Sequence, residues 1–456
     1  MHIMICIFTC VFNQVNYTRM LFLMLESIFI YGNLRNDTEI LIYTSTEFMN
    51  IIKNSCLYNP KIVFEINDTY DTIDKACKAR LDLFQLKSVA KYDKILYLDT
   101  DILIRDDLNP LFDLVKDDIL YVLEEGEIDS DTDFWGKSLF GNELANYPNK
   151  NAFTSGIMLF NTSEKIRTLF KHINADIVNR PRFFATYDQT YIVYNAFKYG
   201  MFNNQILKEF AVNNDHDIHS GKIIHHFPGK PGIYEHKINY MVKFLNKMKI
   251  ATVLKNIDDA KKYIDQHLMP IINGCGELLE GNIFMFHHTT TYTNQFLNKA
   301  KNISNMVLNR NVRNVMEIGF NSGFSTLLML LSNPHIKISC FDLGEHSYTM
   351  PCFNKLKETF GDRLQITIGD SCQTLRQVKD VTYDLIHIDG GHSTEVAESD
   401  IVNCYRLSKK GSILIMDDYD FPNLHQLWDK YIEFYGLQEL EIGIFDSPHH
   451  DIKKVV

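Results

Sequence analysis

The sequence lacks long apolar runs, and this bears first on membranes and export. Its most apolar segments, residues 3–12 and 20–31, are shorter than the roughly 20 residues that a membrane-spanning helix needs. The first follows no basic stretch and precedes no small-residue cleavage site, and the second is interrupted by Glu26. We therefore expect no membrane span and no secretory signal, and interpret both segments as the first strand and first helix of a folded domain.

Paired cysteine motifs are also missing. The nine cysteines are scattered and include no C-x-x-C pair, which is typical of reduced thiols in a cytosolic protein. Five N-x-S/T triplets leave open a secreted glycoprotein, although a chain rich in asparagine forms such triplets by chance. We expect a cytoplasmic location, or the host cytoplasm or virion if the chain is viral.

Basic residues are outnumbered by acidic ones. Lys and Arg total 46 against 57 Asp and Glu, a formal net charge of −11, so we expect no nucleic-acid partner. Hydrophobic residues make up 45% of the chain and charged residues 23%, a balance that excludes disorder. A length of 456 residues predicts two or three domains.

An α/β pattern occurs twice. Residues 1–115 alternate apolar, β-rich segments with helical ones, and the same alternation begins again after about residue 310. Between them, residues 236–310 have a helix-rich pattern with runs of charge. Two starts of a nucleotide-type fold predict two domains, 1–250 and 251–456, with the core of the second at about 311–420. No internal repeat is visible, which excludes a solenoid.

The first candidate site is a pair of carboxylates after an apolar strand. The segment KILYL leads directly into Asp99, Thr100 and Asp101. Carboxylates at i and i+2 of extended backbone point to the same side, close enough to share one divalent cation. Two buried anions without a counter-charge would be unfavourable, which favours a metal; the alternative is a solvated turn.

Further segments extend this pair into a family resemblance. The segment KYDKILYLDTDILIRDDLNPLFDL resembles the metal and nucleotide core of the glycogenin-like, family 8 glycosyltransferases. KARLDLFQL precedes it, and NAFTSGIMLFN, TYDQTYIVYNAF and IIHHFPGKPG follow it, similar to that family's basic helix, N-S-G segment, D-Q helix and H-F-x-G…K-P-W element. The resemblance implies a GT-A fold and the transfer of a hexose from a UDP-sugar, with retention of configuration, to a glycan or glycoprotein acceptor.

The resemblance also implies roles for individual residues. Mn²⁺ would be held by Asp99, Asp101 and His226, a donor set that suits this ion. Asp188 and Gln189 would face the reacting sugar carbon, and because glutamine is a poor nucleophile we expect no firm covalent intermediate. The remaining donor-binding residues would be Thr9 and Tyr17 at the uracil, Arg80 at the phosphates or sugar, Thr154, and Lys230 at the diphosphate.

Three positions depart from the family pattern. Thr154 stands where the family usually has asparagine, which leaves sugar or acceptor contacts open. Gly232 replaces the tryptophan after K-P, so the lid over the donor can differ. His225 precedes His226 and could exchange with it as a ligand; the alternative for a histidine in an apolar run is a satisfied core residue.

The second candidate site begins with glycines between an apolar strand and an apolar helix. VMEIGFNSGFSTLLMLL contains Gly319 and Gly323, and glycine lets a ligand approach the backbone closely, although such a turn also serves packing. Asp342 ends the next strand, nineteen residues after Gly323, where an acid typically binds ribose hydroxyls. LQITIGDS, YDLIHIDGGHS and SILIMDDYD end the following strands with further acids.

These strand ends resemble the class I S-adenosylmethionine-dependent methyltransferases, which have a Rossmann-like fold. The resemblance covers roughly residues 305–420 and is closest to the catechol-type and cephalosporin-hydroxylase-like O-methyltransferases, in which E-I-G…S-G, D-G-x-H and L-x-x-D-D recur. It implies that the methionine part of the cofactor would be bound by Glu317, Gly319, Gly323 and Ser325. Its ribose would be bound by Asp342, and its adenine by Asp370 and Ser371.

The same branch places metal ligands at positions matching Asp389, Asp417 and Asp418. Three acids without a soft ligand favour Mg²⁺ or a similar hard ion, which would stabilise an acceptor hydroxyl as it loses its proton. His392 matches the position of the branch's base, so we predict a general base there. The alternative is a cofactor site without metal, with Asp417 and Asp418 in an exposed turn.

The two halves together predict a bifunctional carbohydrate-modifying enzyme. It would add a hexose and methylate a hydroxyl, and because covalent linkage raises effective concentration we expect both steps to act on one glycan. Two alternatives stay open at this stage. One is a glycosyltransferase whose second domain binds its cofactor without turnover, and the other is a non-enzymatic glycan- or nucleotide-binding protein.

Overall fold

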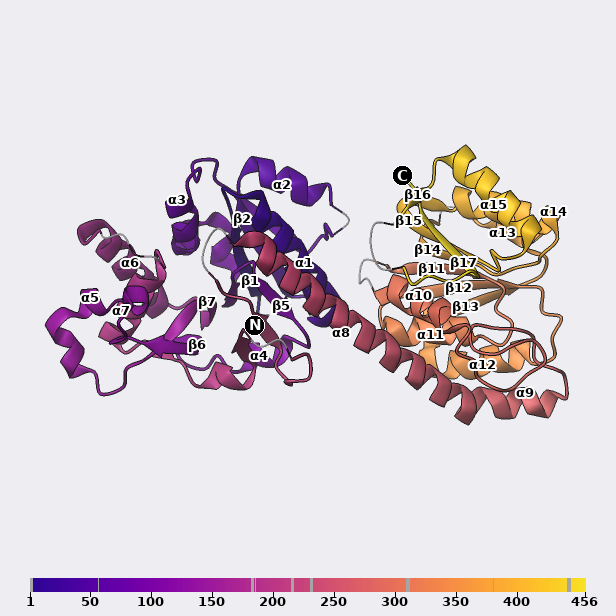
Figure 1. The fold of residues 1–456 in the computed structure, drawn as a ribbon, viewed down its shortest axis with the longest axis horizontal. Helices are drawn as coiled ribbons and strands as arrows, with labels where there is room; N and C mark the ends of the chain where they lie inside the picture. Colours follow the sequence, from indigo (N-terminus) through magenta and orange to yellow (C-terminus); the bar gives the residue numbers. More distant parts are fainter. Residues whose placement is uncertain are drawn as a thin grey trace. The chain divides into compact units, whose positions relative to one another are not determined.

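The computed structural model describes residues 3–55, 57–181, 184, 186–214, 217–229, 233–308, 312–379, 381–440 and 444–456 (Figure 1). Residue contacts divide the chain into two compact units, Met1–Met248 and Lys249–Val456, and the division falls within helix α8 (Tyr234–Tyr263). Lys230 and Gly232, which the sequence analysis singled out, lie outside the described residues.

The first unit contains a seven-stranded sheet and a small three-stranded sheet. The large sheet has the order β3-β2-β1-β4-β7-β6-β8, in which β1 to β4 are parallel and β7 runs antiparallel to both β4 and β6. In the small sheet β10 lies between β5 and β9. The strands are β1 (Ile5–Val11), β2 (Thr38–Thr44), β3 (Ile62–Ile66), β4 (Lys94–Leu98), β5 (Ile102–Ile104), β6 (Leu120–Glu127), β7 (Asn151–Asn161), β8 (Phe202–Asn203), β9 (Ala211–Asn213) and β10 (Ile224–His226).

Helices cover both faces of the large sheet. Alternate residues of β1 point to opposite faces, so Cys6 and Phe8 join one hydrophobic cluster with α6 and α7, and Ile5 and Ile7 join another with α1, α2 and α4. Ser163 caps α6 by accepting a hydrogen bond from the backbone of Ile166. The helices are α1 (Val15–Tyr31), α2 (Thr46–Lys53), α3 (Ile73–Lys78), α4 (Asn109–Asp113), α5 (Lys137–Phe140), α6 (Glu164–Asn179), α7 (Gln189–Tyr199) and the start of α8.

The second unit is built on another seven-stranded sheet, of order β13-β12-β11-β14-β15-β17-β16. The first five of these strands are parallel, and β17 is inserted antiparallel to both β15 and β16. The order of the parallel strands is the 3-2-1-4-5 order of nucleotide-binding sheets. The strands are β11 (Asn314–Ile318), β12 (Lys337–Asp342), β13 (Leu364–Ile368), β14 (Tyr383–Ile388), β15 (Ser408–Asp417), β16 (Gln438–Glu439) and β17 (His450–Lys454).

The helices of the second unit follow its strands in the βα alternation that the sequence predicts. One face of the sheet packs against α14 and α15 in a hydrophobic cluster that includes the fully buried Trp428. The helices are the end of α8, α9 (Met269–Cys275), α10 (Leu297–Leu308), α11 (Phe324–Ser332), α12 (Thr349–Phe360), α13 (Ser371–Gln377), α14 (Thr394–Arg406) and α15 (Pro422–Tyr435). The prediction of an α/β fold with a sheet in each half is confirmed.

Among the described residues, no helix combines the length and the apolar character needed to cross a bilayer. In each of the two seven-stranded sheets the strand order reverses beside the first strand, between β1 and β4 and between β11 and β14. In open α/β sheets ligands bind outside the carboxyl ends of the strands at this point. The sites described below follow these strand ends.

Candidate active sites

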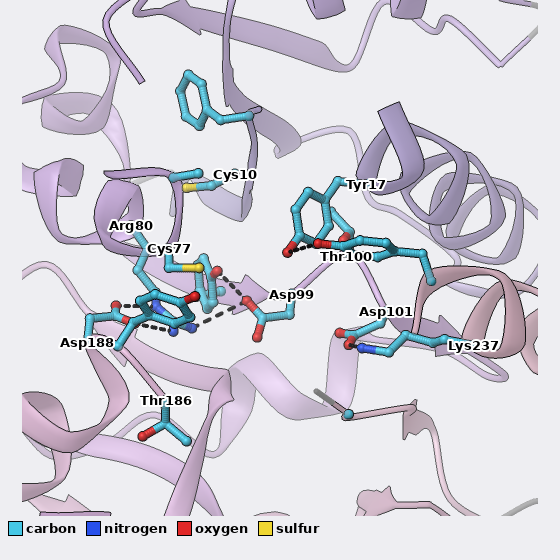
Figure 2. A pocket seen from close by; sticks show the side chains of 16 residues that line it. Cys10, Tyr17, Cys77, Arg80, Asp99, Thr100, Asp101, Thr186, Asp188 and Lys237 are labelled. Atoms are coloured by element: carbon cyan, nitrogen blue, oxygen red, sulfur yellow. Dashed lines mark hydrogen bonds and ion pairs between the residues drawn. The ribbon is translucent and has the colours of Figure 1, made fainter. Parts of the chain in front are cut away.

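The first unit has an open cavity with about 820 Å³ of empty space at the carboxyl ends of β1 and β4 (Figure 2). Five of the residues predicted for this site line it: Tyr17, Arg80, Asp99 and Asp101, predicted to bind donor or metal, and Asp188, predicted to face the reacting sugar carbon. The ring of Tyr17 packs edge-on against Tyr234 at a centroid distance of 5.4 Å. Thr9 is fully buried in β1, and it is the following residue, Cys10, that lines the cavity.

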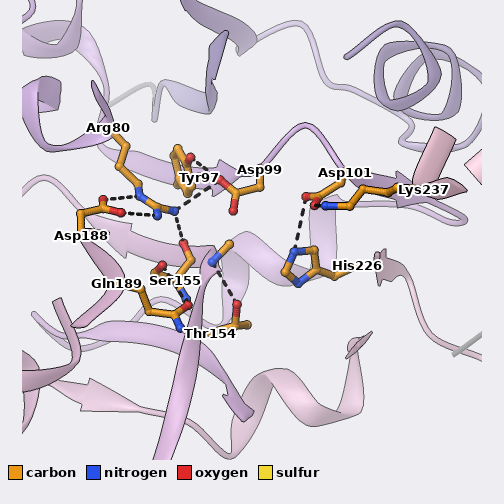
Figure 3. Close-up of polar contacts among 11 residues, drawn as sticks. Arg80, Tyr97, Asp99, Asp101, Thr154, Ser155, Asp188, Gln189, His226 and Lys237 are labelled. Atoms are coloured by element: carbon orange, nitrogen blue, oxygen red, sulfur yellow. Dashed lines mark hydrogen bonds and ion pairs between the residues drawn. The ribbon is translucent and has the colours of Figure 1, made fainter. Parts of the chain in front are cut away.

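The predicted metal ligands of this unit lie together. Asp99 and Asp101 occupy the turn between β4 and β5, and antiparallel pairing of β10 with β5 places His226 opposite Ile102, next to Asp101. Asp99, Asp101 and His226 each offer a ligand atom within 4.8 Å of the others (Figure 3). A cation between them would be reached by two carboxylates and one imidazole, the donor set expected for Mn²⁺.

The imidazole of His226 is held with one nitrogen toward the carboxylates. Its Nδ1 lies 2.8 Å from Oδ1 of Asn213, which leaves Nε2 facing Oδ1 of Asp101 at 3.4 Å. A hydrogen bond at the second ring nitrogen is the usual way in which proteins orient a metal-binding histidine. His225 lies on the other side of the strand, with its ring 4.6 Å from that of Phe244, so it is not part of this group.

Lys237, from the first turns of α8, is a part of the site that the sequence did not reveal. Its Nζ donates a 2.5 Å hydrogen bond to Oδ2 of Asp101, and it lines the cavity. Burial would raise the pKa of Asp101, but Lys237 and His226 outweigh it and hold the pKa well below its usual value. Oδ1 of Asp101 is buried and makes no hydrogen bond, so this charged oxygen is available to a cation.

Gly156 on β7 was also missed, and it makes room for the group. A Cβ at this position would lie 2.7 Å from Cε1 of His226 and 2.9 Å from Oδ2 of Asp99, closer than side chains tolerate. The segment NAFTSGIMLFN therefore forms the wall behind the carboxylates. Thr154, two residues earlier, is buried and accepts a hydrogen bond from the backbone N–H of Gly156 at 3.2 Å.

Arg80 is fully engaged with protein groups (Figure 3). Its Nε and Nη2 donate to the two carboxylate oxygens of Asp188 at 2.6 and 2.7 Å, and its Nη1 donates to the carbonyl of Ser155 at 2.8 Å and to Asp99 at 3.3 Å. Burial raises the pKa of Asp188, although Arg80 opposes this. Next to Asp188, Oε1 of Gln189 accepts a 3.0 Å hydrogen bond from the backbone N–H of Ser155.

In the second unit, the predicted glycines make tight turns at the end of β11. Gly319 has φ +88° and Gly323 has φ +77°, backbone conformations that favour glycine. A Cβ on Gly319 would lie 1.8 Å from the carbonyl oxygen of Asp389, so the strands β11 and β14 can approach here only because this residue has no side chain. Gly323 immediately precedes α11, whose second residue is the buried Ser325.

The predicted acids of this unit differ in what they contact. Asp342 accepts hydrogen bonds from the backbone N–H groups of Asn321 at 2.8 Å and Gly344 at 2.7 Å, which joins the ends of β11 and β12. Asp370 caps α13, whose first residue is Ser371, by accepting from the N–H of Cys372 at 2.9 Å. Glu317 is fully buried, and its Oε1 lies 3.0 Å from Nδ1 of His387, inside the sheet.

Asp389, Asp417 and Asp418, the predicted Mg²⁺ ligands, offer ligand atoms within 4.8 Å of one another. They line a small cavity with about 240 Å³ of empty space together with His392, whose Nε2 lies 2.9 Å from Oδ2 of Asp418. Lys299 of α10 also reaches this group, since its Nζ is 2.6 Å from Oδ1 of Asp417 and 3.7 Å from Oδ1 of Asp418.

Buried charge dominates the electrostatics of this site. Burial together with the charge of Asp417 raises the pKa of Asp389 to about 8. Burial would lower the pKa of His387, but contacts with Asp417 and Glu317 outweigh it and raise the pKa to about 10. The hydrogen bond to Asp418 raises the pKa of His392. Lys299 and His387 thus place positive charge against Asp417, whereas the raised pKa of Asp389 means that its own negative charge is poorly compensated.

The raised pKa of His387 predicts how the stability of the second unit depends on pH. Because the folded-state pKa of about 10 exceeds the ordinary value of 6.5, the bound proton stabilises the fold fully below pH 6.5, and this contribution is lost as pH rises toward 10. We expect His387→Asn to flatten the fall in unfolding free energy between pH 6.5 and 10, measured by Trp428 fluorescence in a Trp135→Phe background. The exposed His425→Asn should keep the slope; equal slopes in all three proteins would contradict the prediction.

Comparison with known protein families gives one match in each half of the chain. Residues 2–200 match the family described as Glycosyl transferase family 8, and residues 316–419 match a family described as Methyltransferase domain. No curated protein sequence matches the chain significantly.

Solved structures show likeness at low sequence identity. The bifunctional glycosyltransferase WbbM is 15% identical over 53% of this chain and 50% of its own, with a TM-score of 0.39, so the chain spans about half of its length. A Klebsiella pneumoniae protein described as an O-methyltransferase is 18% identical over 42% of this chain and 89% of its own, with a TM-score of 0.31. Cofactor-bound Rv0187 from MTB is 17% identical over 45% and 89%, with a TM-score of 0.30.

Two transferase domain families thus match separate parts of the chain. A glycosyltransferase family 8 domain is followed by a methyltransferase domain, which confirms both predicted resemblances. A glycosyltransferase domain of this family implies a sugar donor and an acceptor, and typically a divalent metal. A methyltransferase domain implies S-adenosylmethionine.

Proposed function

We propose that the chain transfers a hexose from a UDP-sugar to a glycan or glycoprotein, with retention of configuration, and that it also O-methylates a sugar hydroxyl. The glycosyltransferase domain would comprise residues 1–250 and the methyltransferase domain residues 251–456. We further propose a cytoplasmic location, which the free thiols of the described cysteines support.

The observation that most supports the first activity is the convergence of Asp99, Asp101 and His226, two of which line the open cavity at the ends of β1 and β4. When bound there, Mn²⁺ would neutralise the charge of the departing diphosphate. Gly156 leaves the space that the group needs, and the unbonded Oδ1 of Asp101 supplies a free ligand atom.

The chain's own residues would shape the rest of the donor site. Tyr17 would stack on the base from the cavity wall, and the ammonium of Lys237 would add positive charge beside the diphosphate, together with Lys230. Arg80 would hold Asp188 in place against the sugar, since its guanidinium already binds both oxygens of that carboxylate. Gln189 would be fixed in turn by its bond to Ser155.

For the second activity, the cofactor would lie over the glycine turns at β11, with its ribose at Asp342 and its adenine near Asp370 and Ser371. His392 would accept the proton of the acceptor hydroxyl, because it lines the small cavity with the carboxylates. The sequence favours Mg²⁺ among Asp389, Asp417 and Asp418, and the three side chains do surround a common point. The ammonium of Lys299 also lies in this group, 2.6 Å from Oδ1 of Asp417.

Mass spectrometry of products formed by the intact chain tests this function. With Mn²⁺, S-adenosylmethionine, a panel of nucleotide sugars and simple glycosides, we expect products heavier by one hexose and by one methyl group. Asp342→Ala should raise the KM for S-adenosylmethionine by about 10–100-fold, the worth of hydrogen bonds to a charged group, and should leave hexose transfer unchanged. Asp101→Asn should have the converse effect, lowering hexose transfer and leaving methyl transfer unchanged.

The alternatives predict different outcomes of the same assay. If the methylated product does not form, or forms equally well with Asp342→Ala, the second domain is not a catalyst and only the glycosyltransferase remains. If the intact chain with Mn²⁺ neither transfers nor hydrolyses any nucleotide sugar, the chain is a binding protein and the proposed function is wrong.

A further inference from the structure

The second unit contains a buried lysine to which neither family resemblance assigns a role. Lys299 lies on α10, and only 7% of its side chain is exposed. Its ammonium contacts Oδ1 of Asp417 at 2.6 Å and approaches Oδ1 of Asp418 at 3.7 Å. A lysine buried to this extent is rare unless it is paired, and here it is paired with two of the three carboxylates predicted to bind Mg²⁺.

Asp417 is also surrounded by other donors. Its Oδ1 accepts a 2.7 Å hydrogen bond from the backbone N–H of Asp418 and lies 3.4 Å from Nε2 of His450. Its Oδ2 lies 3.4 Å from Nε2 of His387. Both oxygens of this carboxylate therefore face nitrogen atoms of the same unit, and all of these side chains are buried.

In the candidate metal site of the first unit, fewer nitrogen atoms face the carboxylate. There Lys237 contacts Oδ2 of Asp101 and Nε2 of His226 lies 3.4 Å from Oδ1. Two nitrogen atoms of the described residues thus face this carboxylate, whereas four face that of Asp417. In the second unit the ammonium lies against the same oxygen of Asp417 that the backbone also binds. Magnesium binds oxygen ligands at about 2.0–2.1 Å, so an ion on Oδ1 of Asp417 would have to displace the ammonium. An ion on Oδ2 would meet the imidazole of His387, whose Nε2 lies 3.4 Å from that oxygen.

We propose that the ammonium of Lys299, not a divalent ion, is the resident cation among Asp389, Asp417 and Asp418, and that methyl transfer in this chain requires no metal. The inference rests on the proposed methyltransferase function for its second clause only. Lys299 is thus a positioning residue: it holds Asp417 and Asp418 together at the end of β15 and supplies the positive charge that the three carboxylates need.

Counting Mn²⁺ ions bound per chain, by electron paramagnetic resonance during titration, tests the inference without any methyl acceptor. We expect the intact chain to bind one ion tightly, and Asp101→Asn to bind none. Adding Lys299→Met to Asp101→Asn should create a new site, with at least a tenfold gain in Mn²⁺ affinity, and Asp389→Asn should abolish it again. Lys301→Met, two residues further along α10, is the matched control and should create no site.

Three results would overturn the inference. They are Mn²⁺ bound by the Asp101→Asn chain and lost on Asp389→Asn, no gain in binding with a folded Lys299→Met variant, and methyl transfer that a chelator abolishes. Lys299→Arg keeps the charge and should stay free of metal, which separates loss of charge from loss of fold. Failure of S-adenosylmethionine to bind would instead count against the proposed function and would leave the ion count unaffected.

Discussion

Replacing Asp101 by asparagine is expected to lower Mn²⁺-dependent turnover of the sugar donor by about 10²–10³-fold, the usual effect of removing one preorganised charge at a transition state. Asparagine keeps the shape of the side chain but removes the anion that lies between His226 and Lys237. The cation would lose a ligand, and the ammonium of Lys237 would lose its partner. Donor hydrolysis at varied Mn²⁺ concentration measures both effects, because no acceptor is needed.

Asp106→Asn provides a control of the same chemical change. Asp106 is an exposed acid five residues further along the chain and does not line the cavity. We expect it to keep full activity and an unchanged requirement for Mn²⁺. Should Asp101→Asn retain wild-type activity while folded, the assignment of the metal site in the first unit would be wrong.

Gly319→Ala is expected to destabilise the second unit by about 3–5 kcal/mol, at the upper end of the range for single substitutions. Two penalties combine at this position. Alanine is strained at φ +88°, and its Cβ would lie 1.8 Å from the carbonyl oxygen of Asp389, so β11 and β14 would have to separate. Denaturant unfolding followed by Trp428 fluorescence, in a Trp135→Phe background, reports on this unit alone.

Gly411→Ala separates the two penalties. Gly411 has φ +91°, almost the same backbone conformation, but a Cβ there would meet nothing within 4 Å. We expect a loss of about 1–2 kcal/mol from the strain alone. If both substitutions lowered the free energy of unfolding equally, the close contact of the new Cβ with the carbonyl of Asp389 would add nothing to the destabilisation.

Much of the fold could be predicted from the sequence because its signals are local. Apolar segments such as ICIFTCV and NVMEI alternate with helical ones, and this alternation alone indicates two α/β sheets. The position of Asp99 and Asp101 after β4 follows from the same pattern. Bringing His226 to them required only that a strand near residue 225 pair with the strand that follows Asp101.

The site residues that the sequence did not reveal depend on contacts between distant parts of the chain. Lys237 and Lys299 lie on helices, and their partners, Asp101 and Asp417, are 136 and 118 positions away in the chain, so no spacing rule links them. Gly156 has an ordinary backbone conformation, and only the atoms that surround it explain why it carries no side chain. Such features depend on tertiary packing, which a pattern of residue types along the chain does not encode.

The pairing of Arg80 has a consequence for how the glycosyltransferase domain can evolve. One guanidinium links the start of α7, through Asp188, to the end of β4, through Asp99, and also grips the carbonyl of Ser155 on β7. These three elements are thereby clamped at fixed separations. New sugar preferences would then arise by exchange of other side chains around Arg80. Loss of Arg80 itself would leave the buried carboxylate of Asp188 without its counter-charge and would remove the contacts that join α7, β4 and β7.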